Sequence, residues 1–231
     1  MASERGFHML GLTRGNFYAH PSLLAFVRDL GKRVEKEKLD YLAIGDMSMP
    51  AGGPFMGSHG SHQSGLDVDI WFRLLPKQIN LATRENAEVI VLVDKPDEVG
   101  RSLNTNWDKT KQVWQKILKM AASDPKVNRI FVNPAIKKYF CENFKQASDF
   151  LWTSKLRAWW GHHEHFHVRL ACPHDSGECI EQQKPEGNGC DENLNWWWSQ
   201  DYALETQKRQ SKKSFVLPEM PAACKRLLEL N

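Results

Sequence analysis

Two segments of the chain alternate strictly between apolar and ionisable residues, and they limit the folds that are open to it. The segments read LDVDI at 66–70 and HFHVRL at 165–170. A period of two places successive side chains on opposite faces of a β-strand. One face of each segment is therefore apolar and can pack on a core, whereas the other presents carboxylates or imidazoles. The pattern predicts two core-backed strands whose polar faces line a cleft or meet solvent.

The rest of the chain mixes helical and strand patterns without a regular βαβ rhythm. Helical spacing predicts helices at 21–38, 107–120, 133–144 and 221–230, the first opened by Pro21. Strands are predicted at 41–44, 66–72, 89–93, 128–132 and 165–171, and a breaker-rich loop at 45–57. This order favours an α+β fold with a small, mostly antiparallel central sheet flanked by helices.

Composition excludes two classes of partner. The net charge is only +3, with 31 basic residues spread among 28 acidic ones, so no basic stripe for nucleic acid is expected. No apolar run approaches the roughly 20 residues that cross a bilayer, so no membrane span is expected. Residues Met1 to Tyr18 do not show the pattern of a secretory signal.

Six of the nine histidines fall in two short clusters, which are His59 with His62, and His162, His163, His165 and His167. If the two alternating strands are neighbours, His62, Asp69 and His167 could meet as three ligands of one metal ion. Two imidazoles, one carboxylate and an open fourth position are typical of catalytic zinc sites. His165 shares a strand face with His167 and could take a proton from water. Asp67 is either a solvated or capping residue or an outer support of this site.

The second histidine cluster also allows another interpretation. Residues 163–167 match H-E-x-x-H, which in zinc proteases lies on a helix. Strand alternation, with Gly161 before the segment and Pro173 after it, argues against that helix. The remaining histidines at 8, 20 and 174 are expected to be surface or hydrogen-bonded residues.

Five cysteines stand at 141, 172, 179, 190 and 224. Cys172 and Cys179 flank a polar loop that suits a local bridge, although five reduced thiols in a cytosolic enzyme are the alternative. Several two-bridge pairings are open from the sequence alone.

Three stretches together resemble the penicillin-insensitive murein endopeptidases, a family of LAS-type metallopeptidases marked by H-x6-D and H-x-H. The stretches are GDMSMPAGG with SHGSHQSGLDVDIWF within 45–72, IFVNPAIKKYFC at 130–141, and WWGHHEHFHVRLACPHDSGEC at 159–179. His62 with Asp69 matches the first motif, and His165 with His167 matches the second. The resemblance extends over most of the chain and is weakest at 75–110 and beyond 180.

The resemblance implies a set of site residues and a reaction. His62, Asp69 and His167 would bind one zinc ion, His165 and His162 would be the catalytic imidazoles, and His59 would be an additional active-site histidine. The implied reaction is hydrolysis of the D-alanyl to meso-diaminopimelyl cross-link of peptidoglycan, and also of diaminopimelyl cross-links. No acyl-enzyme on serine is implied, and the implied location is the periplasm.

The resemblance also bears on domain organisation. It implies bridges Cys141–Cys190 and Cys172–Cys179 and leaves Cys224 without a partner. We expect one domain over 1–231, with a catalytic core at about 40–180 and a polar, disulfide-linked extension at about 180–231. Some relatives bind a second zinc at a dimer interface through an aspartate and a histidine between the two motifs. No histidine occurs here between His62 and His162, so support for that ion and for a homodimer is weak.

Two rival functions fit some of these residues. Two histidines and one carboxylate also describe non-haem Fe(II) oxygenases. A non-catalytic peptidoglycan-binding module on the same fold is the second rival, and the presence of His162 and His165 argues against it.

Overall fold

The computed structural model describes residues 3–53, 60–95 and 102–211. Within this part of the chain, seven strands form one mixed sheet in the order β1-β2-β3-β4-β7-β5-β6. Four neighbouring pairs are antiparallel, and the pairs β2–β3 and β5–β6 are parallel. The strands are β1 Ser3–Glu4, β2 Phe7–Met9, β3 Tyr41–Ile44, β4 Asp67–Leu75, β5 Val127–Val132, β6 Leu156–Ala158 and β7 His165–Leu170. The expected α+β class with a mostly antiparallel sheet is confirmed.

The helices begin where capping chemistry allows. His20 accepts a hydrogen bond from the Ser22 backbone N–H at the start of α1, and Pro21 occupies the first helical position. Asn104 caps α3 in the same way. The helices are α1 Pro21–Lys36, α2 Leu81–Glu85, α3 Thr105–Ala122, α4 Pro134–Asn143, α5 Ala147–Thr153, α6 Glu192–Asn195 and α7 Gln200–Ser211, with short 3₁₀ turns at Leu12–Arg14 and Trp196–Trp198. None of these helices is long and apolar enough to cross a membrane.

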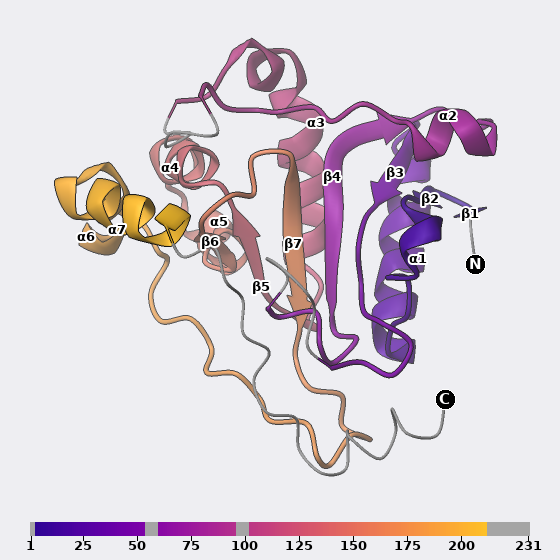
Figure 1. Cartoon of the computed structure of the whole chain (residues 1–231). Helices are drawn as coiled ribbons and strands as arrows, with labels where there is room; N and C mark the ends of the chain where they lie inside the picture. Colours follow the sequence, from indigo (N-terminus) through magenta and orange to yellow (C-terminus); the bar gives the residue numbers. More distant parts are fainter. Residues whose placement is uncertain (1–2, 54–59, 96–101, 212–231) are drawn as a thin grey trace.

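The main core lies between one face of the sheet and the helices α1 and α3, which Figure 1 shows packed side by side behind the strands. Val68 and Ile70 of β4 and Val168 of β7 are fully buried in it. Phe72 meets Trp114 of α3 edge to face, with ring centres 5.2 Å apart. The predicted division of β4 and β7 into an apolar and a polar face is confirmed.

The predicted strand at 89–93 is wrong. Val89 is 45% exposed, and Val93 makes only an isolated bridge with Leu103. The side-chain amide of Asn104 donates to the carbonyls of Val91 and Val93, and the Leu92 N–H donates to the His163 carbonyl. The backbone groups of residues 91–93 are therefore hydrogen-bonded to loop and helix-cap residues instead of to a neighbouring strand.

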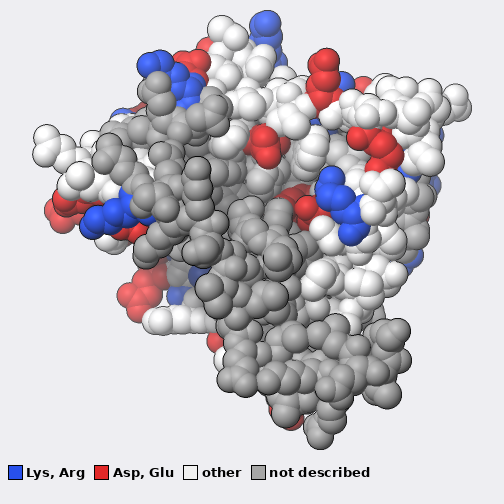
Figure 2. All heavy atoms as spheres, in the orientation of Figure 1, with Lys and Arg blue, Asp and Glu red and all other residues white. Residues whose placement is uncertain are grey.

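The segment after β7 leaves the sheet and returns beside α4, where α6 and α7 lie (Figure 1). Disulfides join Cys141 of α4 to Cys190 and Cys172 to Cys179, which confirms both expected pairings. Cys224 and the predicted helix 221–230 lie outside the described residues. Acidic and basic side chains are interspersed over the described part of the face in Figure 2.

Candidate metal centre

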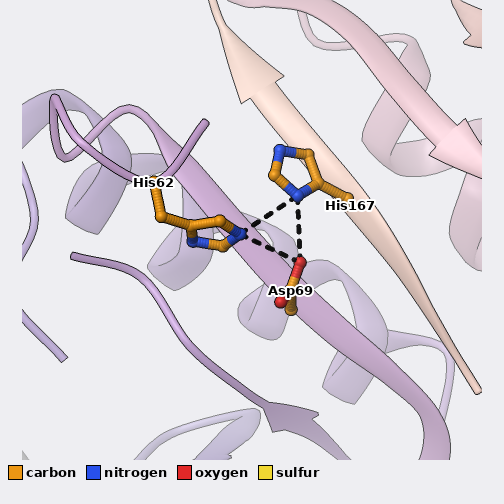
Figure 3. A group of neighbouring side chains, drawn as sticks. All are labelled: His62, Asp69 and His167. Carbon is orange, nitrogen blue, oxygen red and sulfur yellow. Dashed lines mark hydrogen bonds and ion pairs between the residues drawn. The ribbon is translucent and has the colours of Figure 1, made fainter. Parts of the chain in front are cut away.

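Three side chains from two strands and one turn converge on the polar face of the sheet. Asp69 of β4 and His167 of β7 are directly paired in the antiparallel register, and His62 approaches from the turn that precedes β4 (Figure 3). All three residues are at most 3% exposed. One ligand atom from each lies within 4.8 Å of the others.

The spacing of the three atoms fits a small cation. His167 Nδ1 lies 3.0 Å from Asp69 Oδ1 and 3.2 Å from His62 Nε2. The third side of the triangle, from His62 Nε2 to Asp69 Oδ1, measures 3.4 Å. Tetrahedral zinc ligands about 2.0–2.1 Å from the ion lie about 3.3 Å from one another. This buried group could therefore hold a metal ion through two imidazoles and one carboxylate.

Each imidazole is oriented by a partner on its far side. His62 Nδ1 lies 2.5 Å from the Met47 carbonyl oxygen, which can only accept. His167 Nε2 lies 2.8 Å from Asp67 Oδ1, and Arg169 Nη1 donates to the same carboxylate at 3.0 Å. In the neutral rings these partners favour the proton on the outer nitrogen, so the lone pairs of His62 Nε2 and His167 Nδ1 would face an ion bound between them. Asp67 is thus neither solvated nor a helix cap but a buried partner of His167, and its part as an outer support of a metal site stays a prediction.

The electrostatics of the site favour a positive charge between the three residues. Burial alone would raise the pKa of Asp69, but His165, His167 and His62 outweigh it and hold that pKa well below its usual value. Burial alone would lower the pKa of His167, but hydrogen bonds to Asp67 and Asp69 raise it to about 9. The Asp69 carboxylate stays charged and attracts either a proton or a metal cation to the space between the three residues.

His162 and His165 lie beside this group. His165 Nε2 is 3.6 Å from Asp69 Oδ1, and its side chain is 19% exposed. The His162 ring centre lies 4.9 Å from that of His165 and 5.9 Å from that of His167. His162 Nδ1 donates to the Trp160 carbonyl at 2.7 Å. Burial, reinforced by the charges of His165 and His167, lowers the pKa of His162, which keeps this ring neutral.

The H-E-x-x-H interpretation is excluded by the backbone. His163 and Glu164 precede β7, which begins at His165, so no helix places His163 and His167 one turn apart. The Glu164 carbonyl accepts from the Phe72 N–H at 2.8 Å and continues the sheet ladder.

The three histidines outside the two clusters are hydrogen-bonded or lie at the surface, as expected, and His174 is exposed. His8 is buried and hydrogen-bonds the Pro76 carbonyl, and His20 caps α1. His59 lies outside the described residues, so its part in the site stays a prediction.

A cavity of about 820 Å³ opens over the group. Its lining includes Trp159, Trp160, His162 and His165, together with Phe131 and Arg129 of β5. Trp159 is 45% exposed, so an aromatic ring stands at the rim. A buried ligand group at the floor of an open cleft of this size is typical of a site that acts on a bound substrate.

Comparison with known proteins shows the family of the chain. The family model described as penicillin-insensitive murein endopeptidase matches residues 1–229. The chain belongs to this family. Relatives of that name include proteins of Yersinia enterocolitica, 40% identical over 92% of this chain and 74% of the relative, and of Haemophilus influenzae, 35% identical over 96% and 74%. A relative of the same name from Escherichia coli is 35% identical over 96% of this chain and 78% of its own length.

Proposed function

We propose that the chain is a zinc-dependent murein endopeptidase that hydrolyses the D-alanyl to meso-diaminopimelyl cross-link of peptidoglycan, and as a second substrate the diaminopimelyl cross-link. The convergence of His62 Nε2, Asp69 Oδ1 and His167 Nδ1 at 3.0–3.4 Å carries the metal part of this proposal. Family membership supports the murein part. We place the enzyme in the periplasm, because two disulfides suit an oxidising compartment that adjoins the cell wall.

The proposed chemistry divides the site into holding and proton-transfer residues. His62, Asp69 and His167 would hold the ion, which when bound supplies Lewis acidity and lowers the pKa of water to about 7. His165 Nε2 stands at the cavity wall next to Asp69, where it can take a proton from the attacking water and pass it to the departing amine. His162 lines the same cavity, and because its Nδ1–H donates to the Trp160 carbonyl, its Nε2 carries the lone pair.

The two histidines of the H-x-H motif should have separable effects. We expect His165→Ala to retain the metal and lose roughly 10²- to 10⁴-fold in cleavage rate, because only proton transfer is removed. We expect His167→Ala to lose both metal and activity, because one of three ligand atoms is gone. Elemental analysis of the purified variants, together with hydrolysis of a cross-linked muropeptide, measures both effects.

His8→Ala, remote from the cavity, serves as the matched control and should keep metal and activity. Retention of stoichiometric metal by His167→Ala would refute the ligand set. Iron in the purified protein, together with activity that needs a 2-oxo acid and oxygen, would favour the oxygenase alternative.

A further inference from the structure

Arg129 lies on the same face of the sheet as the candidate metal group. It is two residues before Phe131, the residue of β5 that pairs with His167. Phe131 of β5 is paired with His167, and Arg129 is paired with Arg169. Alternate residues of a strand lie about 7 Å apart on one face. Arg129 therefore lies within side-chain reach of whatever occupies the space over His167, and it lines the same 820 Å³ cavity.

Arg129 and the residue it pairs with, Arg169, have different electrostatic surroundings. Arg169 is paired with the buried carboxylate of Asp67 at 3.0 Å. Arg129 Nε donates to Asn128 Oδ1 at 2.9 Å, and its Nη2 donates to the Gln183 carbonyl. Both acceptors are neutral, and among the described residues no carboxylate lies within ion-pair distance of Arg129. Its guanidinium is held by these neutral acceptors, and the carboxylates of Asp67 and Glu181 act on its charge only from beyond ion-pair distance.

The acids nearest to Arg129 are already engaged. Asp67 accepts from His167 and Arg169. Glu181 accepts from the Cys172 N–H at 2.7 Å and from Asn128 Nδ2 at 3.1 Å. Neither carboxylate hydrogen-bonds Arg129, so an anion bound in the cavity can pair with this guanidinium directly.

The proposed substrate carries such an anion. In a D-alanyl to diaminopimelyl cross-link, the carbon that bears the scissile amide nitrogen also bears a free carboxylate. That carboxylate is separated from the carbonyl under attack by two atoms only, so it lies close to the metal group on the side of the departing amine. A guanidinium is the side chain best shaped to bind a carboxylate, by two parallel hydrogen bonds.

We propose, on the basis of the function proposed above, that Arg129 binds this carboxylate and makes the enzyme select free over amidated diaminopimelate at the cross-link. Arg129 is then a specificity-determining residue that positions the leaving group, and it takes no part in proton transfer. The interaction is made equally in the bound substrate and in the transition state, so its loss falls on KM more than on kcat.

The test compares two synthetic cross-linked peptides that differ only in that group, carboxylate in one and carboxamide in the other. Wild-type enzyme should cut the carboxylate form with kcat/KM roughly 10- to 100-fold higher, as expected for a charged hydrogen-bonded pair. Arg129→Gln should cut the two peptides with similar kcat/KM, through a raised KM for the carboxylate form. Arg129→Lys should recover part of the preference, because it restores the charge without the planar fork.

Controls separate this role from a structural one. Arg28→Gln removes the same charge from α1, outside the cavity, and should keep the wild-type preference. Metal content and unfolding midpoint of Arg129→Gln should match those of the wild type. Equal cleavage of both peptides by the wild type, or an unchanged preference in Arg129→Gln, would overturn the assignment of Arg129 while leaving the proposed function intact. Failure of the wild type to cut either peptide would count against the proposed function itself.

Discussion

At the scale of single residues, the site depends on His167 using both of its ring nitrogens. Nε2 is committed to Asp67, and Nδ1 faces His62 and Asp69. Asp67 is fully buried and is itself held by Arg169. The row Arg169, Asp67 and His167 therefore fixes the angle of the ring, and a metal ion bound at the site would replace the Nδ1 proton that the raised pKa of His167 keeps there at neutral pH.

Removal of the Asp67 charge should weaken metal binding. We expect Asp67→Asn to lower zinc affinity about 10- to 100-fold, because the amide is a poorer acceptor for His167 Nε2 and no longer raises the basicity of the ring. Competition with a chromophoric chelator measures the affinity, and circular dichroism checks the fold. Asp29→Asn, an exposed change of the same kind on α1, should bind zinc as the wild type does. Equal affinity in Asp67→Asn and wild type would show that this contact does not support the metal.

At the scale of secondary-structure elements, Lys137 links three parts of the molecule. It lies in α4 with no exposed surface, and its Nζ donates to the carbonyls of Thr153 in α5 and Asn188. The adjacent Cys141–Cys190 bridge ties the same helix to the same segment. Burial, with a smaller effect of the Arg157 charge, lowers the pKa of Lys137 to about 7.

This lowered pKa predicts a pH-dependent stability. Between pH 7 and the ordinary lysine pKa of about 10.4, the unfolded chain binds a proton at Lys137 that the folded chain does not. The free energy of unfolding should therefore rise with pH through this window. Below pH 7 the buried amine is protonated in the folded chain as well, so the full destabilising cost of its charge is present there. We expect the gain from pH 7 to pH 9 to be about 1–3 kcal/mol larger in wild type than in Lys137→Met.

Urea unfolding of both proteins at the two pH values gives this difference directly. The lost hydrogen bonds of Lys137→Met lower its stability by the same amount at both pH values, so they do not affect the comparison. Lys138→Met, a neighbouring half-exposed lysine, should retain the wild-type pH response. Identical responses in wild type and Lys137→Met would mean that the buried amine keeps its proton in the folded protein.

At the scale of the whole molecule, the alternating pattern of two strands predicted the sheet face that carries the site. The reason is that a period of two places the apolar side chains on the buried face and the ionisable ones on the other. It could not show that β4 and β7 are neighbours in a register that opposes Asp69 to His167, since pairing depends on the entire sheet. The short strands β1, β2 and β6 carry too few residues for a pattern and exist because a neighbour pairs with them.

The same limit applied to residues outside the histidine clusters. Met47 orients His62 through a backbone carbonyl, which no side-chain pattern reveals. Arg169 belongs to the alternating segment and was expected on the polar face, whereas Arg129 gave no such signal, and only the pairing of β5 with β7 places it in the same row. Asp67 carried a usable signal, because it shares a strand face with Asp69.

The most direct test of the account is digestion of purified peptidoglycan by the full chain in zinc-loaded and metal-stripped form, with muropeptides identified by mass spectrometry. The account predicts that zinc-loaded protein converts cross-linked dimers to monomers, that stripped protein does not, and that added zinc restores the conversion. Unchanged dimers with zinc-loaded protein, or equal conversion by stripped protein, would contradict it.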